Sequence, residues 1–204
     1  MRNEIRSLGR VGRLPRWLML AWLPCVLAAS VWAGELLEPP FGLKWGDSPE
    51  KLLDWAGRQK LDAVIRLPGD EPALRVVRVE PRKGLLSGTS AAAVEAKFFR
   101  GRLFELTVDY SDPDAPANAM EGRFEEMKRQ LAQQHGRLQA NQQERVVDDQ
   151  FVTRTQAYHR EAVKGLFLLL AATEVEDLLR KTREFRFSVV YRNENLKTGL
   201  RAGE

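Results

Sequence analysis

A serine and a lysine separated by about one helical turn are the first residues whose spacing could support catalysis. Ser48 and Lys51 form an S-x-x-K pattern within "FGLKWGDSPEKLLDWAG", which runs from residue 41 to residue 57. On a helix the two side chains are neighbours, so the lysine could activate the serine hydroxyl as a nucleophile. A structural role fits equally well, because serine is a preferred helix N-cap and Pro49 suits the first helical position.

Two later patterns resemble the remaining signatures of penicillin-binding proteins and serine β-lactamases. A Y-x-N pattern at 191–193 and a K-T-G pattern at 197–199 follow S-x-x-K in the order that this family uses. The resemblance implies a serine hydrolase of envelope polymers that uses Ser48 and Lys51. Here only residues 194–196 separate the two late patterns, whereas the family places them on different elements. The reading of Ser48 as a plain N-cap therefore stays open.

Neither kind of metal site that the sequence suggests has a complete ligand spacing. Four oxygen-bearing side chains precede or begin a predicted helix: Asp109, Asp112, Asp114 and Asn118. They lack the regular acidic spacing and the glycine of a calcium loop, and the helix dipole alone favours acidic residues there. The two histidines, His135 and His159, have no third ligand at zinc-site spacing. We therefore predict no metal and no other cofactor.

Outward-facing strand positions suggest a docking surface for a partner. The predicted partner-binding residues are Arg154, Tyr158, Arg186 and Arg192. A sheet that helices cover on one side leaves its mixed polar face either to solvent or to a partner, which arginine and tyrosine side chains would anchor. Two acids, Glu105 and Asp109, share a strand face but lie about 13 Å apart along it, too far for two acids that act on one bond.

The first 33 residues predict export from the cytoplasm. Residues 1–16 hold five arginines and one acidic residue, and residues 17–33 carry no charge. Basic, apolar and then small residues are the order of a secretory signal peptide, and Ala33 suits the last position before a cut at Gly34. We predict a periplasmic protein. The alternative is an inner-membrane anchor formed by residues 17–33, which are at the short limit for a spanning helix.

Cleavage would leave a chain with no net charge and no thiol. Residues 1–33 hold five of the 32 basic residues and one of the 28 acidic residues, so 27 of each remain in residues 34–204. The positive charge of the whole chain therefore gives no reason to expect a nucleic-acid partner. The one cysteine, Cys25, lies in the predicted signal, so the exported part has no disulfide and must be held together by its core.

Hydrophobic periodicity predicts an α+β domain built on an antiparallel sheet. The two main helices are predicted at 49–57 and 116–135. The strands are predicted at 62–67, 74–80, 94–99, 104–110, 151–159, 165–173 and 184–192. A capping box at 173–176 predicts a short helix over 174–182. The order is roughly α-β-β-β-α-β-β-β with both main helices on one face; the domain covers 34–193, and residues 194–204 form a tail.

Alternating apolar residues identify the expected core. Arg100-Gly101 predicts a two-residue hairpin turn, and the continuous apolar run at 165–173 predicts a strand buried on both faces. The predicted core residues are Phe98, Phe104, Leu106, Val108, Phe124, Met127, Leu131, Leu168, Leu170, Phe185, Phe187 and Val189. The two halves of the chain share an α-then-β outline, but their residues do not align.

The stretch at 41–50, with its W-G-D-S-P-E text, resembles an opening found in small exported proteins of Gram-negative bacteria, where a short strand turns into a helix. This resemblance implies an envelope setting. A looser similarity to outer-membrane assembly modules of the BamE kind rests on the G-x-S start of that helix. We therefore expect a non-catalytic binding or assembly module whose partner is an envelope protein or another envelope component. The alternatives are the hydrolase and a small-ligand binder with a pocket between the sheet and helix 116–135.

Overall fold

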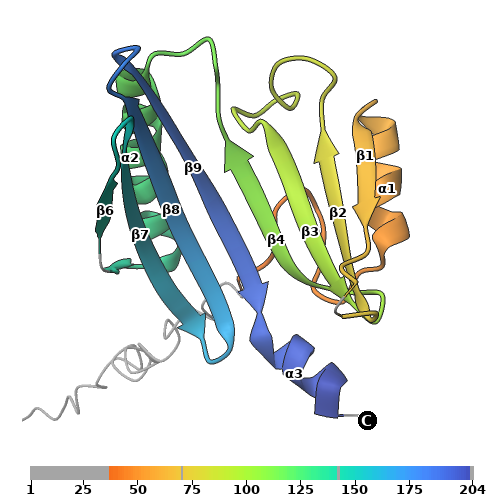
Figure 1. Ribbon diagram of the computed structural model, residues 1–204. Coiled ribbons are helices and arrows are strands. Elements are labelled where there is room, and N and C mark those ends of the chain that lie inside the picture. The colour runs from red at the N-terminus through yellow and green to blue at the C-terminus, as the bar shows by residue number, and fades with distance from the viewer. Residues whose placement is uncertain (1–36, 70, 142, 203–204) are drawn as a thin grey trace, which may run out of the picture. The chain divides into compact units, whose positions relative to one another are not determined.

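The computed structural model describes residues 37–69, 71–141 and 143–202, which form an open antiparallel sheet with helices (Figure 1). The helices in these residues are α1 (Pro49–Arg58), α2 (Ala117–His135) and α3 (Glu194–Ala202). The strands are β1 (Asp62–Arg66), β2 (Leu74–Glu80), β3 (Ala93–Phe99), β4 (Arg102–Tyr110), β5 (Gln139–Ala140), β6 (Glu144–Val147), β7 (Phe151–Val163), β8 (Leu166–Asp177) and β9 (Thr182–Asn193). The predicted α+β class with an antiparallel sheet is confirmed.

The sheet consists of two groups of strands joined at one seam. Its order is β1-β2-β3-β4-β9-β8-β7-β5, with β6 also paired to β7. Within each group, strands that follow one another in the chain are mostly neighbours in the sheet. The seam is the β4–β9 pairing, where Leu106 lies opposite Tyr191 and Val108 lies opposite Val189. These partners are more than 80 positions apart in the chain, so the seam is the long-range step of the fold.

Strand register divides the side chains between two faces of the sheet. Leu106, Val189 and Leu170 share the face that carries the buried strand residues, which we call the core face. Their neighbours in each strand point to the opposite side, which we call the outer face. In β8 the burial alternates, because Leu168, Leu170 and Ala172 are buried on the core face and the residues between them are only partly buried. The prediction that this strand is buried on both faces is therefore wrong.

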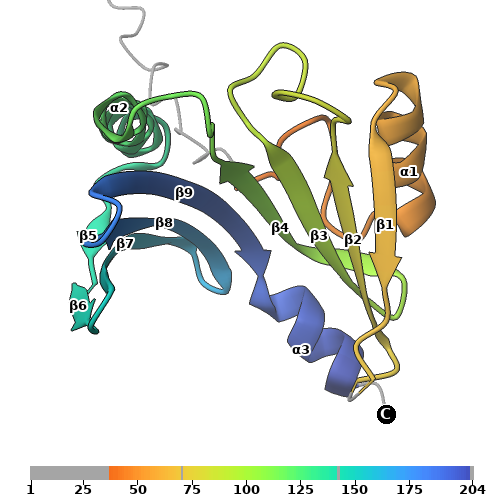
Figure 2. The ribbon, with the colours of Figure 1, turned by 45° about the horizontal axis from the view of Figure 1, so that its top comes forward.

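Two apolar clusters fill the core face. One combines Leu52 and Ala56 of α1 with residues of β2, β3 and β4, and the other combines α2 with residues of β8 and β9. Figure 2 shows α1 beside β1 and β2, and α2 beside β9. Tyr110, Tyr191 and Trp45 pack against both clusters, so they bridge the seam. Of the predicted core residues, all are buried except Met127, which is partly buried against the second cluster.

A bulge in the β3–β4 hairpin displaces one predicted core residue. Arg100 and Gly101 both have positive φ, as the predicted two-residue turn requires. The register then shifts between Lys97 and Phe98, which leaves Phe104 as the extra residue of β4. Phe104 is buried outside both clusters, and the ammonium of Lys197 in α3 lies 5.2 Å from its ring centroid.

Residues 194–202 of the predicted tail form the helix α3, and none of its residues is buried. Arg201 of α3 lies over the Phe99 ring, and Arg100 donates a 2.8 Å hydrogen bond to the carbonyl oxygen of Leu200. The start of α3 is attached to the β7–β8 turn, where Gly165 has a φ of +81° and Asn195 donates to the carbonyl oxygen of Lys164. Cation–π contacts to β3 and β4 and polar contacts to the β7–β8 turn hold α3 in place, and the local sequence does not reveal these long-range partners.

The predicted helix over 174–182 is also wrong, because β8 and β9 continue through this segment to a tight turn. Glu174 and Glu176 extend β8 and pair with Arg154 of β7. Asp177 then accepts hydrogen bonds from two turn amides, and Lys181 has a φ of +54°. Cross-strand ion pairs and an Asx turn thus replace the capping box that the local sequence indicates. The short strands β5 and β6 were not predicted, because exposed edge strands need no apolar alternation.

Replacing Leu168 with aspartate should unfold the protein, because this side chain is fully buried on the core face and a carboxylate there would have no partner. The adjacent change Leu169→Asp places the same charge on the outer face and should leave the protein folded. Urea unfolding of residues 34–204 followed by circular dichroism measures both. A Leu168→Asp variant as stable as the Leu169→Asp variant would contradict the assignment of the two faces.

Candidate functional site

The W-G-D-S stretch is a structural link between the start of the domain and β4. The Trp45 indole donates a 2.6 Å hydrogen bond to the carbonyl oxygen of Leu37, and Gly46 has a φ of +83°. The Gly46 amide donates a hydrogen bond to the carbonyl oxygen of Leu103. The Leu103 amide in turn donates a hydrogen bond to the carbonyl oxygen of Asp47. This reciprocal pair of backbone bonds holds the start of α1 against β4, which explains the tryptophan and the glycine without a ligand.

The geometry around Ser48 and Lys51 gives them structural contacts. Ser48 has the extended backbone of an N-cap, but its side chain makes no capping hydrogen bond. A hydrogen bond from Ser48 is the main cause that lowers the pKa of Glu50. The Lys51 ammonium lies 2.8 Å from a carboxylate oxygen of Asp47, so its charge is already paired. The prediction of a helix start is confirmed, and the expected side-chain cap is replaced by this local network.

The residues of the other two hydrolase patterns lie on different kinds of element. Tyr191 is on the core face of β9, and burial together with the nearby Tyr110 raises its pKa to about 12. Its phenol is therefore neutral at physiological pH and is no ready base. Lys197 lies on α3 over an aromatic ring, whereas the hydrolase resemblance would need K-T-G on a strand. The contacts of these residues are those of a packed helix and a packed strand.

The residues considered as metal ligands are engaged in protein contacts or lie apart. Asp109 accepts a 2.8 Å hydrogen bond from Arg78, and Asp112 accepts one of 3.1 Å from Arg123. His135 ends α2 and His159 lies on the outer face of β7. Within the described ranges, no three His, Cys, Asp or Glu side chains are grouped so that they could hold a metal ion.

The four predicted partner-binding residues do not share one surface. By register, Arg154 and Tyr158 lie on the core face, whereas Arg186 and Arg192 lie on the outer face. The Tyr158 ring is 6.1 Å from Phe124 of α2 by ring centroids, so it faces the helix. A single docking face that contains all four residues is therefore wrong, and the outer-face pair remains as a candidate.

Arg154 belongs to an ion network that leads to α2. Its guanidinium lies 2.8 Å from Glu174, which is also 2.6 Å from Arg183, and Arg183 pairs with Glu121 of α2. Glu174 is largely buried, so two arginines compensate one desolvated carboxylate. This network ties β7, β8 and β9 to the helix and gives Arg154 a structural role.

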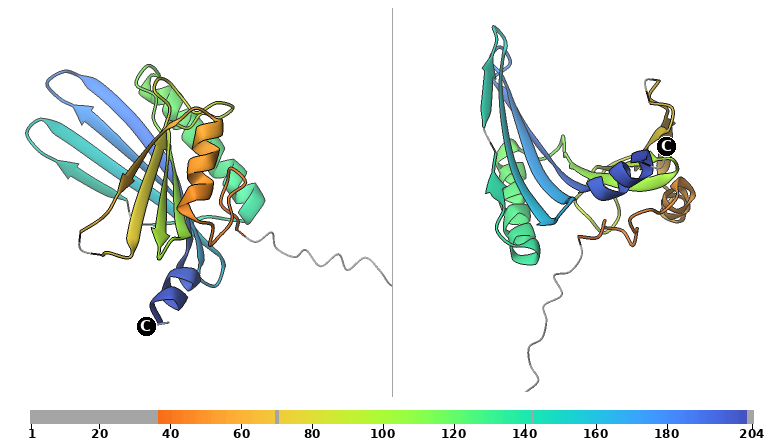
Figure 3. Two further views of the ribbon diagram at one scale, coloured as in Figure 1. Left: turned by 90° about the vertical axis from the view of Figure 1, so that its right-hand side faces the viewer. Right: turned by 90° about the horizontal axis from the view of Figure 1, so that it is seen from below.

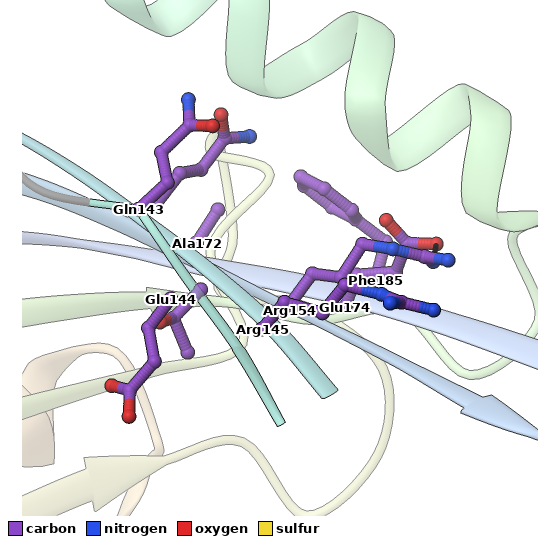
Figure 4. Close-up of a pocket in the computed structure, with 9 residues that line it drawn as sticks. Gln143, Glu144, Arg145, Arg154, Ala172, Glu174 and Phe185 are labelled. Atoms are coloured by element: carbon purple, nitrogen blue, oxygen red, sulfur yellow. Dashed lines mark hydrogen bonds and ion pairs between the residues drawn. The ribbon is translucent and has the colours of Figure 1, made fainter. Parts of the chain in front are cut away.

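A cavity of about 410 Å³ lies beside this network (Figure 4). Arg154, Glu174 and Phe185 gather at one side of it, and Gln143 lies at the other (Figure 4). The volume is within the range of small-ligand pockets. The sequence predicted such a pocket against helix 116–135, but the residues that line this cavity come from β6 to β9 and the segment before β6, and none belongs to α2.

The outer face holds two further cavities along β9. The first, of about 330 Å³, is lined by Arg186, Ser188 and Thr173 together with Arg78 and Asp109. The second, of about 170 Å³, has an apolar floor from β8 and β9, and Arg192 and His159 line it. The His159 Nδ1 atom is buried there without a hydrogen-bond partner. Each cavity therefore combines an arginine of β9 with other residues of the outer face.

The two β9 arginines differ in their electrostatic surroundings. Arg192 donates to Glu105, whose side chain is 5% exposed and also lies 2.7 Å from the Lys97 ammonium. Two cations therefore share one carboxylate, which leaves a net positive charge. Arg186 is exposed, and no carboxylate within 4.0 Å of it is found in the described residues. The outer face along β9 thus carries one arginine without a carboxylate partner in the described residues, Arg186, and one that shares a buried carboxylate, Arg192.

The sequence could have indicated the apolar part of this face. Phe167 and Leu169 belong to the apolar run that predicts a doubly covered strand, but they lie on the outer face and line the second cavity. An apolar run on a strand with one uncovered face places apolar side chains at the surface, which is typical of an interaction site. No protein-family model, no curated protein and no solved structure matches this chain.

Glu105→Gln should destabilise the protein by about 1–3 kcal/mol, because it removes a buried charge that accepts hydrogen bonds from the partly exposed Lys97 and Arg192 at the seam. The matched control is Glu95→Gln, since Glu95 is on the same face but lies 4.0 Å from Arg78 and is more exposed. Urea unfolding at neutral pH compares the two. Equal, small effects would show that the buried carboxylate contributes little to the seam.

Proposed function

We propose that this protein is an exported, non-catalytic binding module of the cell envelope that docks an acidic segment of a partner protein on the outer face along β9. The observation that carries the proposal is the pair of cavities on that face, each beside one arginine, Arg186 or Arg192. The cavity beside Arg192 is apolar and the one beside Arg186 is polar, and arginine next to such cavities is a recurrent anchor in protein interfaces. The exposed Arg186, which has no carboxylate within 4.0 Å in the described residues, favours an acidic partner group over a basic one.

Support for an accessible outer face comes from the arrangement of the helices. In the view from below in Figure 3, α1 and α2 lie on the same side of the strands. The helix residues of both clusters meet strand residues of the core face. A sheet covered in this way leaves its other face to a partner, except where α3 lies over Phe104 and Phe99.

A small-ligand binder is the second candidate, and the cavity of about 410 Å³ beside Arg154 favours it. The two candidates differ in the surface that they require. Substitutions on the outer face would leave ligand binding beside Arg154 intact, and they would abolish docking along β9. For the hydrolase alternative we find no supporting contact in the described part of the chain, because Lys51 pairs with Asp47 and Lys197 lies over Phe104.

Photocrosslinking in the periplasm tests the docking surface. A photocrosslinking amino acid is placed at Thr107, which lies between the two arginines on the outer face. It should capture an envelope protein through an acidic segment, and mass spectrometry identifies that segment. Capture should fall at least tenfold in the Arg186→Glu variant, because the charge reverses at an exposed side chain that forms no ion pair in the described residues.

A reporter at Arg129, on the exposed side of α2, is the matched control and should capture little. The proposal is overturned if Arg129 captures the same protein while the outer-face position captures nothing, or if the captured segment is basic.

The envelope setting rests on the export signal that the sequence predicts, which lies outside the described residues. In those residues no helix is long and apolar enough to cross a membrane. We expect cleavage after Ala33, so that the protein from the periplasm begins at Gly34. Intact-mass measurement checks this, and recovery of the uncleaved chain in the membrane fraction would favour an anchor at 17–33 instead.

A further inference from the structure

One edge of the sheet ends in a strand that is uncovered on both faces. β1 pairs with β2 and with no other strand, so its outward backbone groups have no ladder partner. Val64 on one face is 50% exposed and Ile65 on the other is 51% exposed; Leu67, directly after the strand, is 69% exposed. Edge strands normally carry a proline, a lysine or a bulge that prevents further pairing. β1 has none of these, and its register with β2 is continuous.

The sequence of β1 is complementary to itself in the antiparallel direction. When two copies of D-A-V-I-R run antiparallel about Val64, Asp62 of each copy lies opposite Arg66 of the other. Val64 then meets Val64, and Leu61 meets Leu67 just outside the strand. Opposite charges and apolar pairs directly across a ladder are the stabilising combinations, and one twofold axis produces all of them.

We propose that β1 pairs with β1 of a second copy of this chain, antiparallel and centred on Val64, so that the two sheets become continuous. The charge complementarity of Asp62 and Arg66 selects this occupant and this register. In this register the numbers of two paired residues add up to 128. A slip by one residue changes this sum to 127 or 129, so Asp62 no longer lies opposite Arg66 and each valine moves off the axis.

The fold leaves room for this pairing. In the dimer, the core faces of both copies point to the same side, so the two α1 helices would approach each other there. Ile65 is on the core face and remains half exposed, and Ala63 on the same face is exposed, so α1 does not cover β1. The existing partner of Asp62 is Arg82, which is 82% exposed and can be released at small cost.

The interface would be short, which limits its strength. Pro68 has no amide hydrogen, so the added ladder ends at Leu67 and spans residues 61–67. An interface of this length falls below the roughly 1,200 Å² of standard stable complexes. We therefore expect a dimer that forms and dissociates with concentration. This inference concerns the β1 edge alone and does not depend on the docking surface along β9.

A single cysteine on the twofold axis tests the contact. Residues 34–204 contain no cysteine, so Val64→Cys introduces one thiol that would meet its own copy at disulfide distance. Under mild oxidation this variant should form a covalent dimer at least tenfold faster than Val147→Cys. Val147 is the matched control, because it is a valine of similar exposure on β6 at the other side of the sheet.

Charge reversal tests the register. In the Val64→Cys background, Asp62→Arg and Arg66→Asp should each slow dimer formation about tenfold, because each places like charges opposite one another twice. The Asp62→Arg/Arg66→Asp double reversal restores complementarity and should restore the rate, although the Arg82 contact is lost. Circular dichroism confirms that each variant is folded.

Three outcomes would overturn the proposal. The first is equal rates for Val64→Cys and Val147→Cys. The second is a double reversal that remains as slow as the single reversals. The third is a Val64→Cys protein that crosslinks in the periplasm to another protein and not to itself, which would assign the edge to a different strand donor.

Discussion

The pairing of β4 with β9 is the interaction on which the rest of the structure depends. It joins a group of strands built mainly from local hairpins to a second group that lies far away in the chain. On the core face the seam is sealed by Tyr110, which stacks on Phe187 at 4.6 Å, and by Trp45, which packs against both apolar clusters. On the outer face it is closed by Glu105, which is buried between two cations.

The seam also positions the surface proposed for docking. Because Arg192 must compensate Glu105, its guanidinium is held at the junction beside the apolar residues of β8. Arg186 lies on the same face of the same strand, near the hydroxyls of Ser188 and Thr173. The spacing of the two arginines is therefore set by one strand, which is more rigid than a loop. A partner that reads this spacing would need an extended acidic segment.

The two edges of the sheet differ from its centre in how they are protected. The edge beside β7 is divided between the short strands β5 and β6, which interrupts any long ladder. The β1 edge has a regular strand with apolar side chains on both faces. Natural sheets rarely leave such an edge open, because it pairs with any available strand. Its self-complementary charges make a second copy the specific occupant.

Local patterns determined much of the fold. The apolar stripe of α2, the Arg100-Gly101 turn and the alternation in β9 depend on neighbours in the chain, and each was predicted from them. The segments that were missed depend on contacts made later. Glu174 and Glu176 favour a helix by sequence, but cross-strand pairs with Arg154 hold them in β8. Residues 194–202 form α3 over aromatic rings that β3 and β4 supply, and only the tertiary structure brings these strands beside the segment.

The candidate site shows the same division. From the sequence, arginine and tyrosine at outward strand positions indicate a docking surface, but they do not reveal which positions lie on the same side of the sheet. That depends on the register between β7, β8 and β9, which no local pattern encodes. The register placed Arg154 and Tyr158 on the core face and left Arg186 and Arg192 on the outer face. Residue types thus came from the sequence alone, and their grouping into a surface was decided by strand pairing in the tertiary structure.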